Sequence, residues 1–149
     1  MLYNSAMERL TIELARESDI PFMLELWQDT PGVGLGPGDD YTSVAAFLQR
    51  NPGSCLVLKN QDAVIGTVLG GFDGRRGYIY HLVIHEDYRR QGYGKKLLQE
   101  AVQRLKAINA GKIHLFVLKS NSEVEGFYEK QGWIKRQDIE VFSLDTAKI

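Results

Sequence analysis

Apolar and polar residues recur along most of the chain with the two-residue period of a strand or the longer period of a helix. Alternating or β-branched apolar segments predict strands over residues 10–15, 54–59, 63–72, 78–84, 112–118, 133–136 and 140–144. Helical spacing beside capping residues predicts one helix after Ser18 or Asp19, two more over residues 41–50 and 93–108, and a fourth that reaches Gln131. Between the first two helices, residues 30–40 hold four glycines and two prolines and are predicted to be a loop.

This order, β-α-α-β-β-β-α-β-α-β-β, predicts an α/β (α+β) fold. We expect a mixed, mostly antiparallel, twisted sheet of six to seven strands flanked by about four helices. A chain of 149 residues fits a single domain, residues 1–149. Met7 offers an alternative start, so residues 1–6 are expected to be peripheral to this domain.

Composition and charge exclude several classes of protein. A net charge of −1 argues against a dedicated nucleic-acid binder, and no apolar window reaches the roughly 18 to 20 residues of a membrane span. Cys55 is the single cysteine, which excludes an internal disulfide and favours a cytoplasmic location. It is expected to be a small buried side chain rather than a nucleophile. The three histidines, His81, His85 and His114, are scattered without a close acidic or cysteine partner, so we expect ordinary surface or sheet residues and no metal.

The segment between the strand ending at Ile84 and the helix beginning at Tyr93 carries the clearest chemistry. Its core reads Arg-Arg-Gln-Gly-Tyr-Gly-Lys-Lys, residues 89–96. Glycine lets the backbone approach a ligand closely, and the first turn of a helix offers unpaired N–H groups and a positive dipole end. The segment therefore predicts a phosphate-binding cradle. A dinucleotide fingerprint or a P-loop fits less well, because the third glycine and the Gly-Lys-Ser/Thr ending are missing.

Two sequence blocks resemble the GNAT superfamily of acyl-CoA-dependent N-acetyltransferases, in particular its small bacterial members. Arg89, Gly92 and Gly94 are similar to the family's Arg/Gln-x-x-Gly-x-Gly/Ala hallmark. Residues 121–133, from Asn121 to Trp133, are similar to its second block, an Asn followed seven residues later by Tyr128 and then by Glu-Lys-x-Gly-aromatic. The resemblance extends over residues 10–144 and implies acetyl-CoA as cosubstrate, with no metal.

The resemblance also implies the residues that hold acetyl-CoA. Backbone groups of the fourth strand would hold the pantetheine arm, amides of the cradle the pyrophosphate, and an asparagine the pantetheine or a water beside it. The corresponding residues are Leu82, Val83 and Ile84 on the strand, Arg89, Arg90, Gln91, Gly92, Tyr93, Gly94 and Lys95 in the cradle, then Asn121 and Tyr128.

Tyr128 matches the family's general acid, which protonates the leaving CoA thiolate. The acceptor amine must lose a proton, yet Tyr78 and Tyr80 stand where some relatives have an acid or histidine, and Phe116 where others have a Glu. We therefore expect a water chain, or an acid of the 30–40 loop, to act as base. The candidate acceptor-binding residues are Trp27, Asp39, Asp40, Tyr78 and Tyr80, although the two aspartates also suit a helix cap.

The leading hypothesis is an N-acetyltransferase that transfers acetyl directly to a small-molecule amine or a peptide in a ternary complex. Two alternatives stay open: a non-catalytic acyl-CoA-binding sensor or interaction module, and an acyltransferase for another acyl group or acceptor. Exposed edge strands leave a homodimer open as well.

Overall fold

The computed structural model describes residues 10–149, and they fall into two compact units that divide after Phe116. The expectations for residues 1–6 and Met7 lie outside the described residues. The first unit holds β1 (Leu10–Leu14), α2 (Ile20–Gln28), α3 (Tyr41–Arg50), β2 (Cys55–Asn60), β3 (Ala63–Phe72), β4 (Gly77–Ile84), α4 (Tyr93–Ala107) and β5 (Ile113–Leu115). The second holds α5 (Glu125–Glu129). Short 3-10 helices are η1 (Glu17–Asp19), η2 (Glu86–Tyr88), η3 (Lys119–Val124), which is kinked at Asn121, and η4 (Thr146–Lys148).

The five strands form one mixed sheet in the order β1-β2-β3-β4-β5. The first four are antiparallel neighbours, and β5 runs parallel to β4 after the α4 crossover. This confirms the predicted mixed, mostly antiparallel α/β class and the order of elements up to α5.

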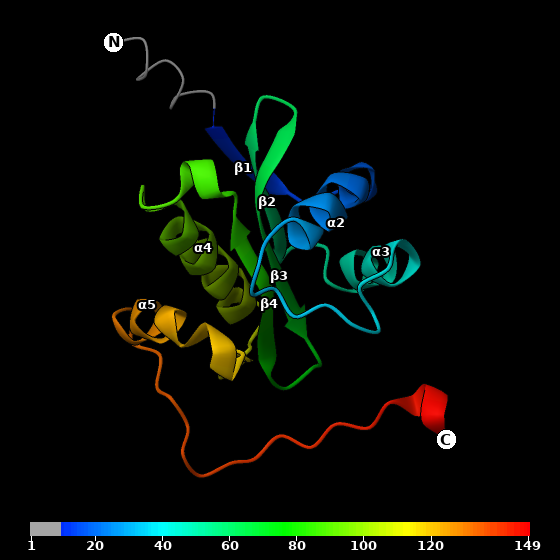
Figure 1. Cartoon of the computed structure of the whole chain (residues 1–149), viewed down its shortest axis with the longest axis vertical. Helices are drawn as coiled ribbons and strands as arrows, with labels where there is room; N and C mark the ends of the chain where they lie inside the picture. The colour runs from blue at the N-terminus through cyan, green and yellow to red at the C-terminus, as the bar shows by residue number, and fades with distance from the viewer. Residues whose placement is uncertain (1–9) are drawn as a thin grey trace. The chain divides into compact units, whose positions relative to one another are not determined.

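Helices cover both faces of the sheet: α2 and α3 lie on one face and α4 on the other (Figure 1). On the first face, apolar side chains of α2 and α3 pack on alternate residues of the central strands. This core contains Ile20, Met23, Leu26, Trp27, Val44, Leu48, Cys55, Val57, Leu69 and Val83. On the opposite face, Gly66 leaves room for Leu97 of α4, since a Cβ there would lie 3.2 Å from the leucine's Cδ1. Burial on both sides explains why the central strands are nearly continuous apolar runs.

A short structural motif ends each of the two later helices. Asn109 takes the left-handed conformation, φ +76°, two residues after α4 ends at Ala107. Gly132, φ +92°, lies three residues after the end of α5 at Glu129, which is two residues before the predicted end at Gln131.

The sheet has five strands rather than six to seven, because the two strands predicted over residues 133–136 and 140–144 do not form. A strand exists only when a neighbour takes its backbone hydrogen bonds, and the described residues of the second unit contain no strand. Ile134 and Phe142 are correspondingly 83% and 94% exposed. Alternation of apolar residues alone was therefore insufficient there.

Candidate active site

A left-handed turn joins β4 to α4 at the predicted cradle. Arg90 and Gly92 have φ of +62° and +85°, and Gly92 is the N-cap of α4. No side chain caps this fifteen-residue helix, and its first N–H to C=O bond runs from Lys96 to Gly92. The preceding amides, including those of Tyr93 and Gly94, are therefore available to a ligand. Successive N–H groups in such a turn form an anion-binding concavity.

The cradle is tied back to the strand that leads into it. Nε of Arg89 donates to the carbonyl oxygen of Ile84 at 2.8 Å, and the amide of His85 donates to the carbonyl oxygen of Ile65 at 2.8 Å. A Cβ added at Gly92 would meet nothing within 4 Å, so the space in front of the turn is open. The geometry fits a diphosphate approaching the main chain.

β4 and β5 pair only over a short stretch, at Gly77, Tyr78 and Ile79 of β4. From Tyr80 to Ile84, β4 pairs with β3 but has no strand partner on its other side among residues 10–149. Backbone groups of Leu82, Val83 and Ile84 on that side can therefore bind an extended ligand as a neighbouring strand would. This is the stretch expected to hold the pantetheine arm.

Aromatic side chains gather on the face of the sheet that α3 covers. The rings of Tyr78 and Tyr80 stack with centroids 6.3 Å apart and an interplanar angle of 19°. Tyr80 also meets Phe47 of α3 edge-on at 6.0 Å, and Phe116 after β5 at 6.5 Å. Phe116 is 60% exposed, and burial raises the pKa of Tyr80. The structure thus brings Tyr78 and Tyr80 together on one partly open aromatic surface.

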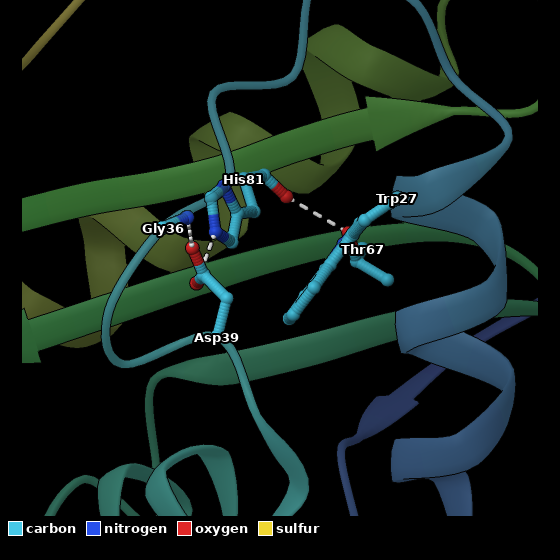
Figure 2. Close-up of polar contacts among 5 residues, drawn as sticks. All are labelled: Trp27, Gly36, Asp39, Thr67 and His81. Carbon is cyan, nitrogen blue, oxygen red and sulfur yellow. Dashed lines mark hydrogen bonds and ion pairs between the residues drawn. The ribbon is translucent and has the colours of Figure 1, made fainter.

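The two adjacent aspartates of the 30–40 loop have different partners. Asp40 is the N-cap of α3, and its Oδ2 accepts the amide of Ser43 at 3.3 Å. The hydrogen bonds to Ser43 lower the pKa of Asp40. Asp39 instead pairs with His81 of β4, with Oδ1 of Asp39 2.8 Å from Nε2 of His81 (Figure 2).

His81 was expected from the sequence to be an ordinary sheet or surface residue, whereas the structure pairs it with an acid of the 30–40 loop. Its partner lies 42 positions earlier in the chain, so no local pattern relates the two. The one sequence feature that pointed toward the pair was an acid in the loop named as a candidate base.

Trp27 supports His81 from α2. The indole ring lies 4.5 Å from the imidazole, centroid to centroid, and is itself buried. Its Nε1 donates to Oγ1 of Thr67 at 2.8 Å, and that hydroxyl donates to the carbonyl oxygen of His81, also at 2.8 Å. Trp27 therefore lies beside the histidine, on the side of α2, and is linked through Thr67 to its carbonyl oxygen (Figure 2).

Asn121 and Tyr128 belong to the second compact unit. Asn121 lies in η3, and Tyr128 lies in α5 with its ring edge-on to Phe127 at 5.2 Å and to Trp133 at 6.0 Å. Burial raises the pKa of Tyr128, so its phenol holds its proton at neutral pH.

Cys55 is buried at the start of β2, as predicted, and its thiol donates to the carbonyl oxygen of Gly70 at 3.6 Å. Burial raises the pKa of this thiol to about 12. Because the thiolate is the nucleophilic form, this cysteine is unsuited to covalent catalysis.

The comparisons with known proteins identify the class of protein to which this fold belongs, the acetyltransferases. The profile of the acetyltransferase (GNAT) family matches residues 20–133. An acetyltransferase of Pectobacterium atrosepticum is 33% identical over 122 residues, which is 81% of this chain and 85% of that protein.

Two solved structures have the same fold. The Ard1 protein of Thermoplasma volcanium superposes with a TM-score of 0.74 at 21% identity, covering 85% of this chain and 83% of its own. A chain of the NatC complex bound to Gag peptide and CoA gives a TM-score of 0.74 at 20% identity, covering 87% of each chain. The chain belongs to the GNAT acetyltransferase family and is an acetyl-CoA-dependent N-acetyltransferase.

No helix within residues 10–149 is both long and apolar enough to span a bilayer.

Proposed function

We propose that residues 1–149 form one N-acetyltransferase domain that transfers acetyl from acetyl-CoA to a primary amine by direct attack in a ternary complex. The observation that carries this proposal is the open side of β4, which leads straight into the left-handed turn at Arg90 and Gly92. A strand edge followed by a phosphate cradle suits a ligand with an extended amide-bearing arm and a diphosphate. The buried thiol of Cys55 argues against an acyl-enzyme intermediate.

On the cosubstrate side, Leu82, Val83 and Ile84 offer backbone groups to the pantetheine arm. The amides of residues 90–95 hold the pyrophosphate, and Arg89 keeps this segment folded back on β4 through its bond to Ile84. Asn121 binds the pantetheine or a water next to it. An amide near Val83 or Ile84 stabilises the negative charge that develops on the thioester oxygen.

Tyr128 acts as the general acid. Attack by the amine breaks the C–S bond, and the phenol gives its proton to the sulfur as charge develops there. A phenol whose pKa is raised by burial remains protonated throughout the physiological range, so the acid is present in the required form.

The acceptor binds on the aromatic surface of β4, beside the loop that carries Asp39. The stacked rings of Tyr78 and Tyr80 form the wall of this site. The buried ring of Trp27 packs against His81, and Asp40 fixes the end of the loop by capping α3. Aromatic faces attract ammonium groups and apolar chains alike, so the acceptor is a small amine or the amino group of a peptide.

The test is an acetylation screen of purified protein with acetyl-CoA over small amines and peptides, read by release of free CoA thiol. Tyr128→Phe should lower turnover on the best acceptor by about 10²-fold while calorimetry gives an unchanged affinity for acetyl-CoA. A variant as active as the wild type would remove Tyr128 from its role.

The screen also separates the alternatives. Acetyl-CoA binding without turnover on any amine would favour the sensor or interaction module. Turnover with a longer acyl-CoA, or with a hydroxyl acceptor, would favour an acyltransferase of different specificity.

A further inference from the structure

A β-bulge in β4 turns His81 toward the face of the sheet that carries Tyr78 and Tyr80, where we propose that the acceptor binds. Leu69 pairs with Tyr80 and Thr67 pairs with Val83, so one residue of β3 lies opposite two residues of β4. His81 lies in this interval with φ +48°. Strict alternation would place His81 on the opposite face from Tyr80, whereas the bulge brings its ring onto Trp27, on the side covered by α2 and α3.

The imidazole is held by a carboxylate that is itself fixed. Nε2 of His81 lies 2.8 Å from Oδ1 of Asp39, and Oδ2 of Asp39 accepts the amide of Gly36 at 2.8 Å (Figure 2). The side chains of His81 and Asp39 are only 13% and 21% exposed. By contrast, His85 and Asp87 lie 3.8 Å apart with 42% and 75% exposed. Only the first arrangement has the shielding and short distance of a preorganised pair.

We propose that His81 is the base that deprotonates the acceptor amine and that Asp39 is its positioning residue. This proposal rests on the proposed acetyl transfer. With Asp39 ionised, Nε2 carries the proton of the hydrogen bond, which leaves the lone pair of Nδ1 to accept a proton. The imidazolium that results is stabilised by the Asp39 carboxylate.

The protons balance as follows. The ammonium group gives one proton to Nδ1 of His81, and the neutral amine then forms the N–C bond to the thioester carbon. The C–S bond breaks, and the sulfur takes the proton of Tyr128. The nitrogen loses its second proton to solvent, from which Tyr128 regains one, and His81 releases the first to solvent. The products are the amide, CoA thiol and one proton.

The need for a base depends on the amine. A lysine-type amine with a pKa of about 10.4 is neutral in only about one molecule in 2,500 at pH 7. An α-amino group with a pKa of about 8 is neutral in about one in ten. Loss of a base should therefore slow strongly basic acceptors far more than weakly basic ones.

The environment of His81 is simple enough for such a test. Side chains of α2, β3 and the 30–40 loop contact His81: the Trp27 ring, the Thr67 hydroxyl and the Asp39 carboxylate. Of these, Asp39 is the titratable group, and the 30–40 loop brings no lysine or arginine.

The experiment measures kcat/KM at pH 7 for a primary alkylamine and for its trifluoromethyl counterpart, whose amino group is largely neutral at that pH. His81→Gln should lose about 10²-fold or more on the alkylamine and less than tenfold on the fluorinated amine. The alkylamine rate of the variant should rise about tenfold for each pH unit between 7 and 9. Asp39→Asn should show the same selectivity with a smaller loss, and acetyl-CoA affinity should stay within twofold.

His85→Gln is the matched control and should behave as the wild type on both amines. Equal losses on the two amines would overturn the proposal, because a structural role does not depend on amine pKa. If His81→Gln does not fold, Asp39→Asn decides by the same comparison. If the wild type binds acetyl-CoA but acetylates neither these probes nor any amine of the screen, the proposed acetyl transfer is refuted, and the role of His81 as base is refuted with it. If the wild type transfers acetyl but His81→Gln loses equal activity on both amines, only the role of His81 is refuted.

Discussion

The indole Nε1 of Trp27 lies 2.8 Å from the hydroxyl oxygen of Thr67, although the two residues are 40 positions apart and both fully buried. The same hydroxyl donates to the carbonyl oxygen of His81, at the bulge in β4. One threonine therefore satisfies a buried donor from α2 and a buried acceptor at the bulge, and it joins α2, β3 and β4.

We expect Thr67→Val to destabilise the fold by about 1–3 kcal/mol, because the variant keeps the shape but leaves the Trp27 N–H without an acceptor. Urea unfolding measures this change. Thr11→Val, on the exposed side of β1, is the control and should stay within about 0.5 kcal/mol of the wild type.

A double-mutant cycle identifies the partner. In a Trp27→Phe background the unsatisfied donor is gone, so the cost of Thr67→Val should fall by at least about 0.5 kcal/mol. Strict additivity of the two changes would show that the hydrogen bond contributes nothing.

The sequence predicted what depends on neighbours along the chain. The Gly-rich turn at Gly92 lies between an apolar strand and an amphipathic helix, so its structure follows from local pattern, and it was confirmed. The partnership of Asp39 with His81 depends on the register of β3 against β4, where one extra residue reverses the alternation. Period-two reasoning has no means of locating such a bulge. The two predicted C-terminal strands are absent for a different reason. The apolar and polar residues around Val141 do alternate, but no strand within residues 10–149 pairs with this segment.

Substitutions at Gly92 test the cradle and distinguish the effect of backbone conformation from that of steric crowding. A Cβ there would meet no atom within 4 Å, yet φ is +85°, which costs an L-residue about 1–2 kcal/mol. Gly92→Ala should therefore weaken acetyl-CoA binding by about tenfold, and Gly92→Glu should weaken it further by placing a negative charge before the pyrophosphate. Calorimetry measures both affinities.

The control for this series is Gly111→Ala, at an equally open position without a left-handed φ. Its affinity for acetyl-CoA should equal that of the wild type. If Gly92→Glu also binds with wild-type affinity, the pyrophosphate does not sit at this turn.

Cys55 should be silent toward thiol reagents in the folded protein. The thiol is buried, so a reagent cannot reach it. Burial also raises its pKa to about 12, so the reactive thiolate is scarce at pH 8. A disulfide reagent such as DTNB should release no colour from native protein and one equivalent after unfolding in guanidinium chloride. Rapid reaction of the native protein would mean that the start of β2 opens, and it would reopen the question of a covalent intermediate.

Tyr128 gives a pH prediction whose sign follows from burial. Because burial raises its pKa above the ordinary value of 10.0, the folded chain holds this proton more tightly than the unfolded chain does. The stability linked to this group is therefore fully present below about pH 10 and is lost as the pH rises through the raised value.

Subtracting the alkaline absorbance titration of Tyr128→Phe from that of the wild type isolates this phenol among the seven tyrosines. The difference should titrate above pH 10, and turnover should show no alkaline decline from Tyr128 between pH 7 and 9. A difference curve with its midpoint below 10 would mean that the phenol is ionised more readily than an exposed tyrosine, which contradicts a buried acid held in its protonated form.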